Sequence, residues 1–536
     1  MALGCLLATP AALRGQDTTA GPRYLPAQIP AGAGRTEPVR IAGGLLRGTA
    51  ATSGVRVFVG LPYAAPPVGE LRWRAPRPAA PWKGVRDATR FGPRCMQLPV
   101  FSDMVFRSGG MSEDCLYLNV WAPARSAGRR LPVLVYFYGG GFIAGDGSEL
   151  RYDGESLARR GVVVVTANYR LGVFGFLSLA ELTRESLHRA SGDYGLLDQV
   201  AALEWVRRNI AAFGGNPSRV TIGGESAGSI SVCALMASPL SRRLIAGAIG
   251  ESGGMIHPTF APVPLADAER RGLEFARGVG AASLAGLRAL PADSLLAAAG
   301  RPGSARFPAT VDGWFLPASP AEIFAAGAQS RVPLLVGWNS VEADWRAQLA
   351  GADSTPRNYA AALERLFGAQ AGEAMLILPG ATPEQVMESG TLLAGATFTA
   401  YSTWKWAELQ RRAGQPVYRY LYVHPRPAPV VPGPNPARPG AVHSAEIEYA
   451  LGNLPTNKVY LWTAEDDSVS AAMESYFASF VKTGHPSGAG LPRWPAAEAG
   501  DSTQIMVLDA RPRVGPAPHE DAYRFLDRFY TGSRGR

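Results

Sequence analysis

The sequence predicts an α/β fold in which a mostly parallel, doubly wound central sheet carries helices on both faces. Three observations support this prediction: apolar strand-like runs alternate with helical stretches, several of these runs are apolar on both faces, and no internal repeat interrupts the alternation. Strands separated by helices favour parallel pairing, because the intervening helix returns the chain to the edge from which it left. Runs that are apolar on both faces are typical of a sheet that helices cover on both sides.

Local patterns set where the strands and helices are expected. Residues 131–138 (LPVLVYFY) and 161–167 (GVVVVTA) are short, continuous apolar runs that predict buried strands. Residues 196–213 have apolar side chains at helical spacing, and residues 219–222 predict the strand that follows. The Ala-rich residues 265–299 favour helix and are expected to form a cap over the site. Further strands are expected at residues 245–249, 332–336 and 417–423.

Length and composition favour one large globular domain. The chain has 536 residues, of which 47% are hydrophobic and 18% are charged, as in a folded protein with a large core. We expect this domain over residues 39–530, after a flexible tail or signal remnant over residues 1–38. The Pro-rich residues 425–439 are expected to be a loop within the domain.

Charge and hydropathy argue against two classes of partner. The formal net charge is +9, but the arginines are scattered and form no basic block or aromatic-interleaved stripe, so nucleic acid is not an expected partner. No window approaches the ~18 unbroken apolar residues that a membrane span needs. The sequence carries no signal for an oligomeric state.

The four cysteines bear on the cellular compartment. Cys95 and Cys115 flank a loop, and on spacing alone they are either a disulfide or two free thiols. A disulfide implies an oxidising compartment, so we expect export to the periplasm or the exterior. The apolar start, residues 1–8, is interpreted either as the tail of a signal sequence or as a site for lipid attachment at Cys5. Cys233 falls on a predicted helix and is expected to be buried.

Ser226 lies at the centre of a G-x-S-x-G sequence, residues 224–228 (GESAG), between a predicted strand and a predicted helix. In that setting the turn lifts the serine hydroxyl above the edge of a parallel sheet and directs the next backbone N–H to the same point. The pattern therefore predicts acyl transfer through a serine ester. Residues 250–254 (GESGG) also fit, but the residues after them do not begin a helix, so Ser226 is preferred to Ser252.

A serine nucleophile needs a base, and the chain has six histidines. In this architecture the order along the chain is serine, acid, histidine, which excludes His188. His443 follows the Pro- and Gly-rich loop shortly after a predicted strand, where such a fold holds its base. On position alone, a surface histidine is the alternative. The other four histidines each adjoin a proline: His257, His424, His485 and His519.

The acid and the oxyanion donors are expected in loops that follow strands. Residues 332–337 lead into a loop that carries Glu342 and Asp344, and the spacing does not separate these candidates from each other or from an ordinary solvated acidic loop. The glycine run at residues 139–141 follows a predicted strand, and glycines let backbone N–H groups approach a developing oxyanion. A phosphate-binding loop is disfavoured, because no Lys-Ser/Thr follows the glycines.

Six segments resemble, in the same order, those of the type-B carboxylesterases. This family belongs to the α/β-hydrolase superfamily and includes cholinesterases and bacterial para-nitrobenzyl esterases. The resemblance runs from about Val39 to about Leu508, and six matches in order make it specific. The matching segments are residues 60–69, 113–120, 138–142, 168–170, 195–199 and 224–228.

The resemblance implies a carboxylic ester hydrolase that acts on a small-molecule ester through a serine acyl-enzyme, without cofactor or metal. It implies that Glu342, rather than Asp344, forms a triad with Ser226 and His443. The other residues that it implies are the oxyanion donors Gly140, Gly141 and Ala227, the neighbours of the triad Glu225 and Ser252, the disulfide Cys95–Cys115, and the ion pairs Arg72–Glu113 and Arg170–Asp198.

Three departures from the family pattern bear on function. Tyr138 precedes the glycines, where many bacterial relatives have histidine. No tryptophan lies between Cys95 and Cys115, where cholinesterases place the ring that holds the choline cation, so choline esters are not expected as main substrates. Asp193 stands where the family more often has asparagine. Two alternatives stay open: a non-catalytic binding or adhesion protein of the same family, and an amidase or carbamate hydrolase with the same site.

Overall fold

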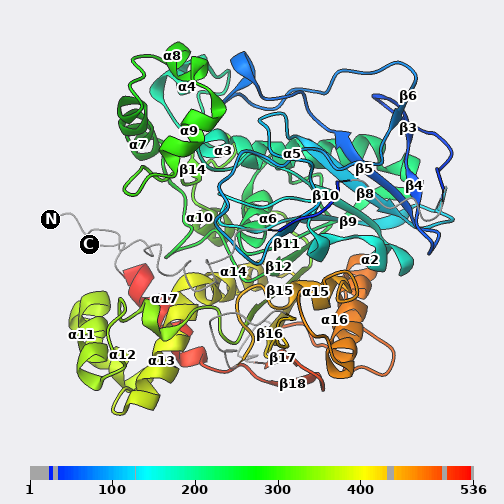
Figure 1. The fold of residues 1–536 in the computed structure, drawn as a ribbon. Helices are drawn as coiled ribbons and strands as arrows, with labels where there is room; N and C mark the ends of the chain where they lie inside the picture. The colour runs from blue at the N-terminus through cyan, green and yellow to red at the C-terminus, as the bar shows by residue number, and fades with distance from the viewer. Residues whose placement is uncertain (1–22, 28–33, 127, 431–439, 498–503, 533–536) are drawn as a thin grey trace.

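The structure is a computed structural model that describes residues 23–27, 34–126, 128–430, 440–497 and 504–532. An eleven-stranded sheet runs through its centre (Figure 1). In sheet order the strands are β18 (Arg513–Pro516), β17 (Gln504–Leu508), β16 (Val417–Tyr422), β15 (Leu334–Asn339), β12 (Gly247–Glu251), β11 (Gly215–Glu225), β9 (Leu131–Phe137), β10 (Val163–Ala167), β8 (Tyr117–Ala122), β5 (Arg56–Pro62) and β4 (Thr49–Ala50).

The sheet is parallel at its centre and antiparallel at its edges. All neighbouring pairs from β17 to β10 are parallel. The pair β18–β17 at one edge and the run from β10 to β4 at the other are antiparallel. The predicted strands are confirmed, because β9, β10, β11, β12, β15 and β16 overlap them in turn. The mostly parallel α/β architecture predicted from the alternation of patterns is therefore correct.

The register of the parallel strands brings their carboxyl ends to one edge of the sheet. Glu225 of β11 pairs with Glu251 of β12, and Glu251 pairs with Gly337 of β15. Gly224 of β11 pairs with Phe137 at the end of β9. The glycine run, both G-x-S-x-G serines and the acidic loop follow these strand ends, so they meet above the same edge, as in other open α/β sheets.

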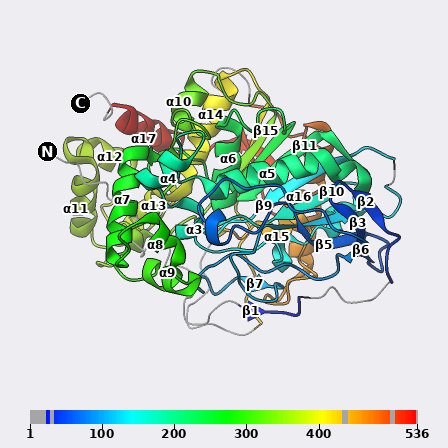
Figure 2. The same cartoon turned by 90° about the horizontal axis from the view of Figure 1, so that it is seen from above.

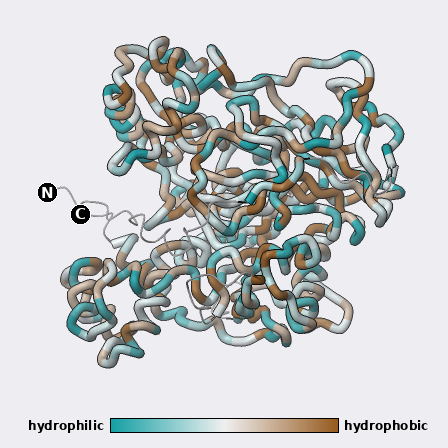
Figure 3. The backbone as a smooth tube through the Cα atoms, viewed as in Figure 1, coloured by the Kyte–Doolittle hydropathy of each residue, from teal (hydrophilic) through white to brown (hydrophobic). Residues whose placement is uncertain are grey.

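Helices cover both faces of the sheet (Figure 2). α5 (Tyr194–Asn209), α6 (Ala227–Ala237) and α14 (Tyr401–Arg412) pack on one face, and α2 (Glu155–Arg159), α15 (Ile447–Leu451) and α16 (Ala464–Thr483) pack on the other. Every residue of β10 and β12 is buried, as two-sided cover requires. Figure 3 shows the most hydrophobic stretches along these central strands, which form the main core.

Two further groups of helices extend to the left of the view in Figure 1. The first is α7 (Leu265–Gly278), α8 (Leu284–Ala289) and α9 (Ala292–Ala299), which occupy the stretch predicted to form a helical cap. The second has a separate hydrophobic core and consists of α11 (Pro356–Phe367), α12 (Ala371–Ile377), α13 (Pro383–Gly395) and α17 (Glu520–Gly532). The second group was not predicted, although Thr355 and Pro356 carry a typical helix-start signal.

Smaller elements complete the fold. Among the described residues there are three additional sheets, two of which are formed by β2 (Val39–Ile41), β3 (Gly44–Arg47) and β6 (Val85–Asp87), and by β13 (Val263–Pro264) and β14 (Thr310–Val311). Short helices include α3 (Gly172–Phe176), α4 (Ala180–Glu185) and α10 (Pro320–Ala325). A π-helical segment, η6 (Ala396–Ala400), joins α13 directly to α14.

Some sequence predictions fall outside the described residues. Cys5 and the rest of residues 1–22 lie outside them, as do residues 431–439 of the Pro-rich stretch. Nearer the domain, Arg23–Tyr24 form β1 and pair in parallel with β7 (Val105–Phe106). The domain boundary at residue 39 stays a prediction. Among the residues that the structure describes, no helix combines the length and apolar character needed to cross a lipid bilayer.

Candidate active site

Ser226 occupies a sharp turn between the central strand β11 and helix α6. Its φ of 55° lies in the left-handed region, which costs energy for a residue with a side chain. The Ser226 N–H donates to the carbonyl of Glu251 at 2.8 Å, which ties the turn to the neighbouring strand. A Cβ at Gly228 would lie 2.0 Å from the carbonyl oxygen of Phe137, and one at Gly224 would lie 2.5 Å from the backbone of Gly228. Both glycines of the predicted turn are therefore sterically required.

His443 lies between Ser226 and Glu342. Its Nε2 is 2.9 Å from Ser226 Oγ, and its Nδ1 is 2.5 Å from Glu342 Oε2. The loop that carries His443 is fastened to the acidic loop, because the N–H of Val341 donates to the carbonyl of Ala441 at 2.8 Å. The structure thus brings together the three side chains that the sequence proposed from distant parts of the chain.

The second carboxylate oxygen of Glu342 also accepts hydrogen bonds. Its Oε1 accepts hydrogen bonds from the backbone N–H of Asn339 and from Ser252 Oγ, each at 2.6 Å. Asp344, the other candidate acid, instead accepts from the N–H of Arg346 at 2.9 Å and forms an ion pair with that arginine. Geometry therefore separates the two acids that spacing left open: Glu342 contacts the imidazole, and Asp344 caps a short helix.

The glycine run lies against the serine. A Cβ at Gly139 would be 3.1 Å from the Cβ of Ser226, and Gly140 and Gly141 have φ of 111° and 63°. Within the described part of the chain, the backbone N–H groups of Gly140, Gly141 and Ala227 donate no hydrogen bond. These three unpaired N–H groups belong to the serine turn or to the glycine run that packs against it.

A cluster of buried carboxyl groups surrounds the histidine. Glu225 Oε1 lies 3.3 Å from His443 Nε2 without forming a hydrogen bond to it. Glu446 accepts from Asn339 Nδ2 at 2.5 Å, and Glu251 accepts from Tyr136 at 2.9 Å. The resemblance implied only Glu225. Glu446 and Glu251 were missed as site residues, because an acidic residue next to a strand end looks the same in sequence whether it is buried or solvated.

Burial shifts the protonation of this cluster. Loss of solvent raises the pKa of Glu225 to about 8 and the pKa of Glu446 to about 7. It also raises the pKa of Glu251 well above its ordinary value, with a further contribution from Glu446. Burial by itself lowers the pKa of His443, but the charges of Glu225 and Glu342 outweigh it and raise this pKa to about 9. The environment therefore favours an imidazolium at residue 443.

Apolar side chains lie beside His443 and beside the glycine run. The ring of Phe398, on the π-helical segment η6, stands edge-on to His443 with 4.9 Å between ring centres. Phe260 packs against Phe398 at 6.3 Å. On the other side, Met104 belongs to a small apolar cluster with Phe101 and reaches within 3.1 Å of the Cβ position of Gly140. Within the described residues there is no group of three or more His, Cys, Asp or Glu side chains arranged to hold a metal ion.

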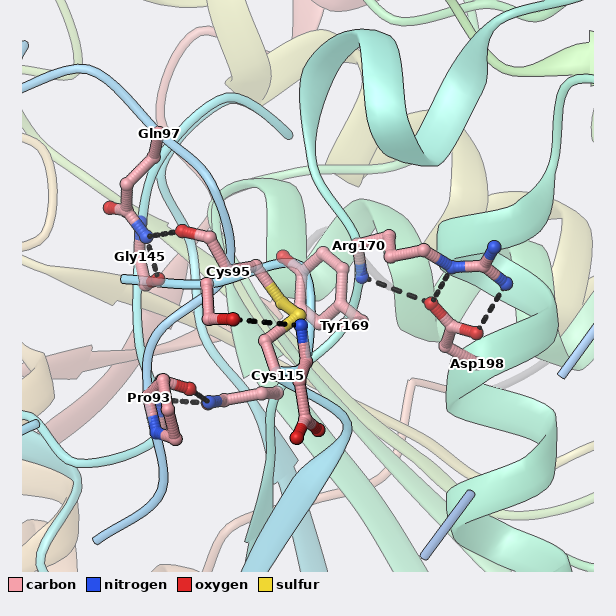
Figure 4. The surroundings of a disulfide bond; sticks show 12 residues. Pro93, Cys95, Gln97, Cys115, Gly145, Tyr169, Arg170 and Asp198 are labelled. Atoms are coloured by element: carbon pink, nitrogen blue, oxygen red, sulfur yellow. Dashed lines mark hydrogen bonds and ion pairs between the residues drawn. A yellow bond between two sulfur atoms is a disulfide. The ribbon is translucent and has the colours of Figure 1, made fainter. Parts of the chain in front are cut away.

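A disulfide joins Cys95 and Cys115 near the loop after the glycine run (Figure 4). Next to this disulfide, Gln97 exchanges two hydrogen bonds with the backbone of Gly145, at 2.8 and 2.9 Å. The expected ion pairs are also present: Arg170 with Asp198 at 2.7 Å and Arg72 with Glu113 at 2.6 Å. Cys233 is a buried free thiol, as expected from its place on α6.

Tyr138 takes the place where many bacterial relatives carry histidine. Its ring stacks on Tyr169 with 4.4 Å between centres, and the Tyr169 hydroxyl donates to the carbonyl of Tyr138 at 2.7 Å. The Tyr138 hydroxyl donates to the carbonyl of Tyr169 at 3.1 Å. The stacking and hydrogen bonds between the two tyrosines therefore fix the strand end from which the glycine run begins.

Comparison with known proteins identifies the family. The family model described as "Carboxylesterase family" matches residues 35–526, which is most of the chain. The chain belongs to the carboxylesterase family. This carboxylesterase is 35% identical to the fumonisin B1 esterase of Sphingopyxis macrogoltabida over 83% of its own length and 82% of the relative's. It is 36% identical to the cocaine esterase of Homo sapiens over 90% and 88% of the two chains.

Solved structures of the family support the same assignment. The carboxylesterase superposes on a PNB esterase with a TM-score of 0.78 and 33% identity, over 91% of its own chain and 99% of the other. It is also 35% identical to the para-nitrobenzyl esterase of Bacillus subtilis (strain 168), over 89% and 96% of the two chains. The fold is therefore that of the α/β-hydrolases, and the protein is a serine carboxylesterase that hydrolyses esters.

Proposed function

We propose that this carboxylesterase cleaves its substrates with Ser226 as nucleophile, His443 as general base and acid, and Glu342 as the group that orients the histidine. The observation that carries the proposal is the continuous set of contacts from Ser226 Oγ to His443 Nε2 (2.9 Å) and from His443 Nδ1 to Glu342 Oε2 (2.5 Å). A serine hydroxyl is a weak nucleophile until a base accepts its proton, and this arrangement supplies the base and its orientation.

The reaction follows two acyl-transfer steps. Ser226 Oγ attacks the ester carbonyl carbon while His443 Nε2 takes the hydroxyl proton. The tetrahedral intermediate collapses as His443 gives that proton to the leaving alkoxide, which releases the alcohol and leaves an acyl-enzyme. A water molecule then gives a proton to His443 and attacks the acyl carbonyl. Release of the carboxylic acid, with the proton returned to Ser226, restores the enzyme.

The backbone N–H groups of Gly140, Gly141 and Ala227 are the proposed oxyanion donors. Their lack of hydrogen-bond partners among the described residues supports this role, because donors already in use would not serve an oxyanion. Gly139 lies close to Ser226, so the glycine run faces the point of attack. Loss of one such donor typically lowers kcat by about 10²–10³-fold.

Glu225 and Ser252 are proposed to act through the triad rather than on the substrate. Ser252 Oγ donates to Glu342 at 2.6 Å and fixes the carboxylate that orients His443. Glu225 lies 3.3 Å from His443 Nε2, and its negative charge favours the imidazolium that forms during each proton transfer. Both residues belong to the mechanism as positioning groups.

Uncharged small-molecule esters are the proposed substrates. Phe398 and Phe260 form an apolar wall beside His443, and Met104 and Phe101 form one beside the glycine run. Apolar walls favour uncharged acyl and alcohol groups, because burial of a charge without a partner is costly. We further propose export to an oxidising compartment, which the Cys95–Cys115 disulfide supports.

Labelling with a fluorophosphonate tests the nucleophile directly. The wild-type protein should be labelled on Ser226, and Ser226→Ala should lose both the label and about 10⁴-fold or more of its turnover of a p-nitrophenyl ester. Ser252→Ala is the matched control, since Ser252 lies in the second G-x-S-x-G sequence but does not contact His443. It should keep the label. A label that persists on Ser226→Ala and disappears from Ser252→Ala would reverse the assignment.

A further inference from the structure

A cavity of about 220 Å³ lies beside α4 and the N-terminal end of α5. No residue of the proposed triad or oxyanion site lines it. Its walls come from four segments: the chain around Trp73, the loop after α4, the start of α5, and the turn around Asp312 and Trp314. The cavity is therefore a feature of the molecule that ester hydrolysis leaves unexplained.

Asp193 lines this cavity with a carboxylate oxygen that has no partner. The residue is 1% exposed. Its Oδ1 accepts a hydrogen bond from the N–H of Thr310 at 2.9 Å, whereas its Oδ2 has no hydrogen-bond partner in the described part of the chain. A buried polar atom left without a partner is unfavourable, so this oxygen marks a position where a hydrogen-bond donor would be bound.

Asp312 adds a second carboxylate to the same cavity. It is buried, and its Oδ1 accepts from the backbone N–H groups of Trp314 and Leu316 at 3.0 and 2.9 Å. Neither Asp193 nor Asp312 forms an ion pair with another described residue. Burial and the nearby Asp312 raise the pKa of Asp193 well above its ordinary value. A bound cation would favour the ionised carboxylate at both residues and offset the repulsion between them.

Aromatic rings also line the cavity. Trp314, Tyr194 and His188 contribute to its wall, and His188 stacks on Trp314 with 3.7 Å between ring centres and 7° between planes. Aromatic faces attract organic cations. Two arginines also line the wall: Arg74 is paired with Glu185 at 3.2 Å, and Arg77 is exposed.

We propose that this cavity binds a small organic ammonium ion, whose N–H groups donate to Asp193 Oδ2 and whose hydrocarbon part packs against Trp314 and Tyr194. The unpaired oxygen supplies the acceptor, the second carboxylate supplies additional negative charge, and the aromatic wall supplies the contact surface. The cavity is larger than a single ion needs, which favours an amine with a hydrocarbon substituent over a metal cation.

Calorimetric titration with benzylammonium tests the proposal, with benzyl alcohol as the neutral analogue. The wild-type protein should bind benzylammonium saturably and bind benzyl alcohol at least about tenfold more weakly, because only the ammonium pairs with the carboxylates. Asp193→Asn keeps the shape of the side chain and the acceptor for Thr310, and it should also weaken benzylammonium binding by about tenfold or more. Ammonium that bound instead at the proposed active site would be unaffected by this substitution.

Two further variants complete the experiment. Glu388→Gln removes the same charge from an exposed position on α13 and should leave binding unchanged. Asp312→Asn should weaken binding without changing the hydrogen bond from Thr310 to Asp193. If Asp193→Asn does not fold, Asp312→Asn tests the proposal in its place. Equal affinity for the amine and the alcohol, or wild-type affinity in the folded variants at both aspartates, would overturn the proposal.

Discussion

The ring of Phe398 stands edge-on to the imidazole of His443, at 4.9 Å between centres and 64° between planes. Phe398 reaches this position from a π-helical segment, a form of helix that is rare and often found at functional sites. The same helix packs against the acid, because a Cβ at Gly395 would lie 3.3 Å from the Cβ of Glu342. One continuous helical run therefore contacts both groups that control the serine.

Phe398→Ala should lower kcat/KM by between about twofold and tenfold, because an edge-to-face pair contributes about 0.5–1.5 kcal/mol. Steady-state kinetics on a short-chain p-nitrophenyl ester measures this loss. Phe260→Ala is the matched control, since Phe260 contacts Phe398 but not His443. A larger effect at Phe260 than at Phe398 would show that the aromatic pair acts only as a wall for the substrate.

Glu342→Gln should lower kcat by about 10³–10⁴-fold, because an amide cannot stabilise the imidazolium and favours the wrong tautomer of His443. Asp344→Asn, two residues along the same loop, should keep wild-type kcat. The pair of variants tests whether proximity to the ring, rather than position in the loop, identifies the acid. Comparable losses in both variants would contradict the assignment.

Glu225→Gln should move the acidic limb of the kcat/KM profile to lower pH, by roughly one unit. His443 must be neutral to accept the serine proton, so activity rises as pH increases through its pKa. The negative charge of Glu225 helps to raise the pKa of His443 to about 9, and removal of that charge lowers it. Glu388→Gln should leave the limb in place. A shift to higher pH in Glu225→Gln would oppose this account.

Glu251→Gln should stabilise the protein, and the gain should increase with pH. Burial raises the pKa of Glu251 above its ordinary value of 4.5, so the folded chain holds this proton more tightly than the unfolded chain. Stability is therefore lost as pH rises from about 4.5 towards the folded-state pKa, by at most about 1.4 kcal/mol per pH unit. Glutamine does not ionise and avoids this loss. Melting temperatures of both proteins between pH 5 and pH 9 provide the measurement, and a constant difference across that range would count against the prediction.

Cys95→Ser/Cys115→Ser should lower the free energy of unfolding by about 2–4 kcal/mol, since the disulfide closes a loop between cysteines 20 positions apart. Chemical denaturation of the wild type and the variant measures this difference. A reductant should lower the melting temperature of the wild type and leave that of the double variant unchanged. If the reductant lowered both equally, a disulfide would not be the cause.

The strands and the serine turn were predictable because local sequence patterns determine them. Residues 131–138 and 161–167 are apolar on both faces, and this is enough to identify β9 and β10 at the centre of a covered sheet. The G-x-S-x-G turn was equally clear, since the steric demands on Gly224 and Gly228 arise within a few residues of Ser226 or from the adjoining strand.

The rest of the site depends on contacts between segments far apart in the chain. Glu342 and Asp344 occupy the same loop. The pairing of Val341 with Val442 and the hydrogen bond from Ser252 to Glu342, which hold Glu342 beside His443, join segments far apart in the chain. Glu446 and Glu251 gain their roles from burial, which a single acidic residue in sequence does not reveal. A π-helix has about one more residue per turn than an α-helix. No feature of the sequence composition predicts this segment or the position that it gives Phe398.

The three side chains of the proposed triad lie after the ends of β11 and β15 and in the loop after β16. β15 and β16 are neighbours in the sheet, and β12 lies between β15 and β11. The three side chains span residues 226–443, and a sheet that has lost any one of these strands has lost the geometry. Hydrolysis of a chromogenic ester therefore reports complete assembly: in any refolded or ageing preparation, the rate divided by that of fresh enzyme equals the fraction of molecules with an intact centre.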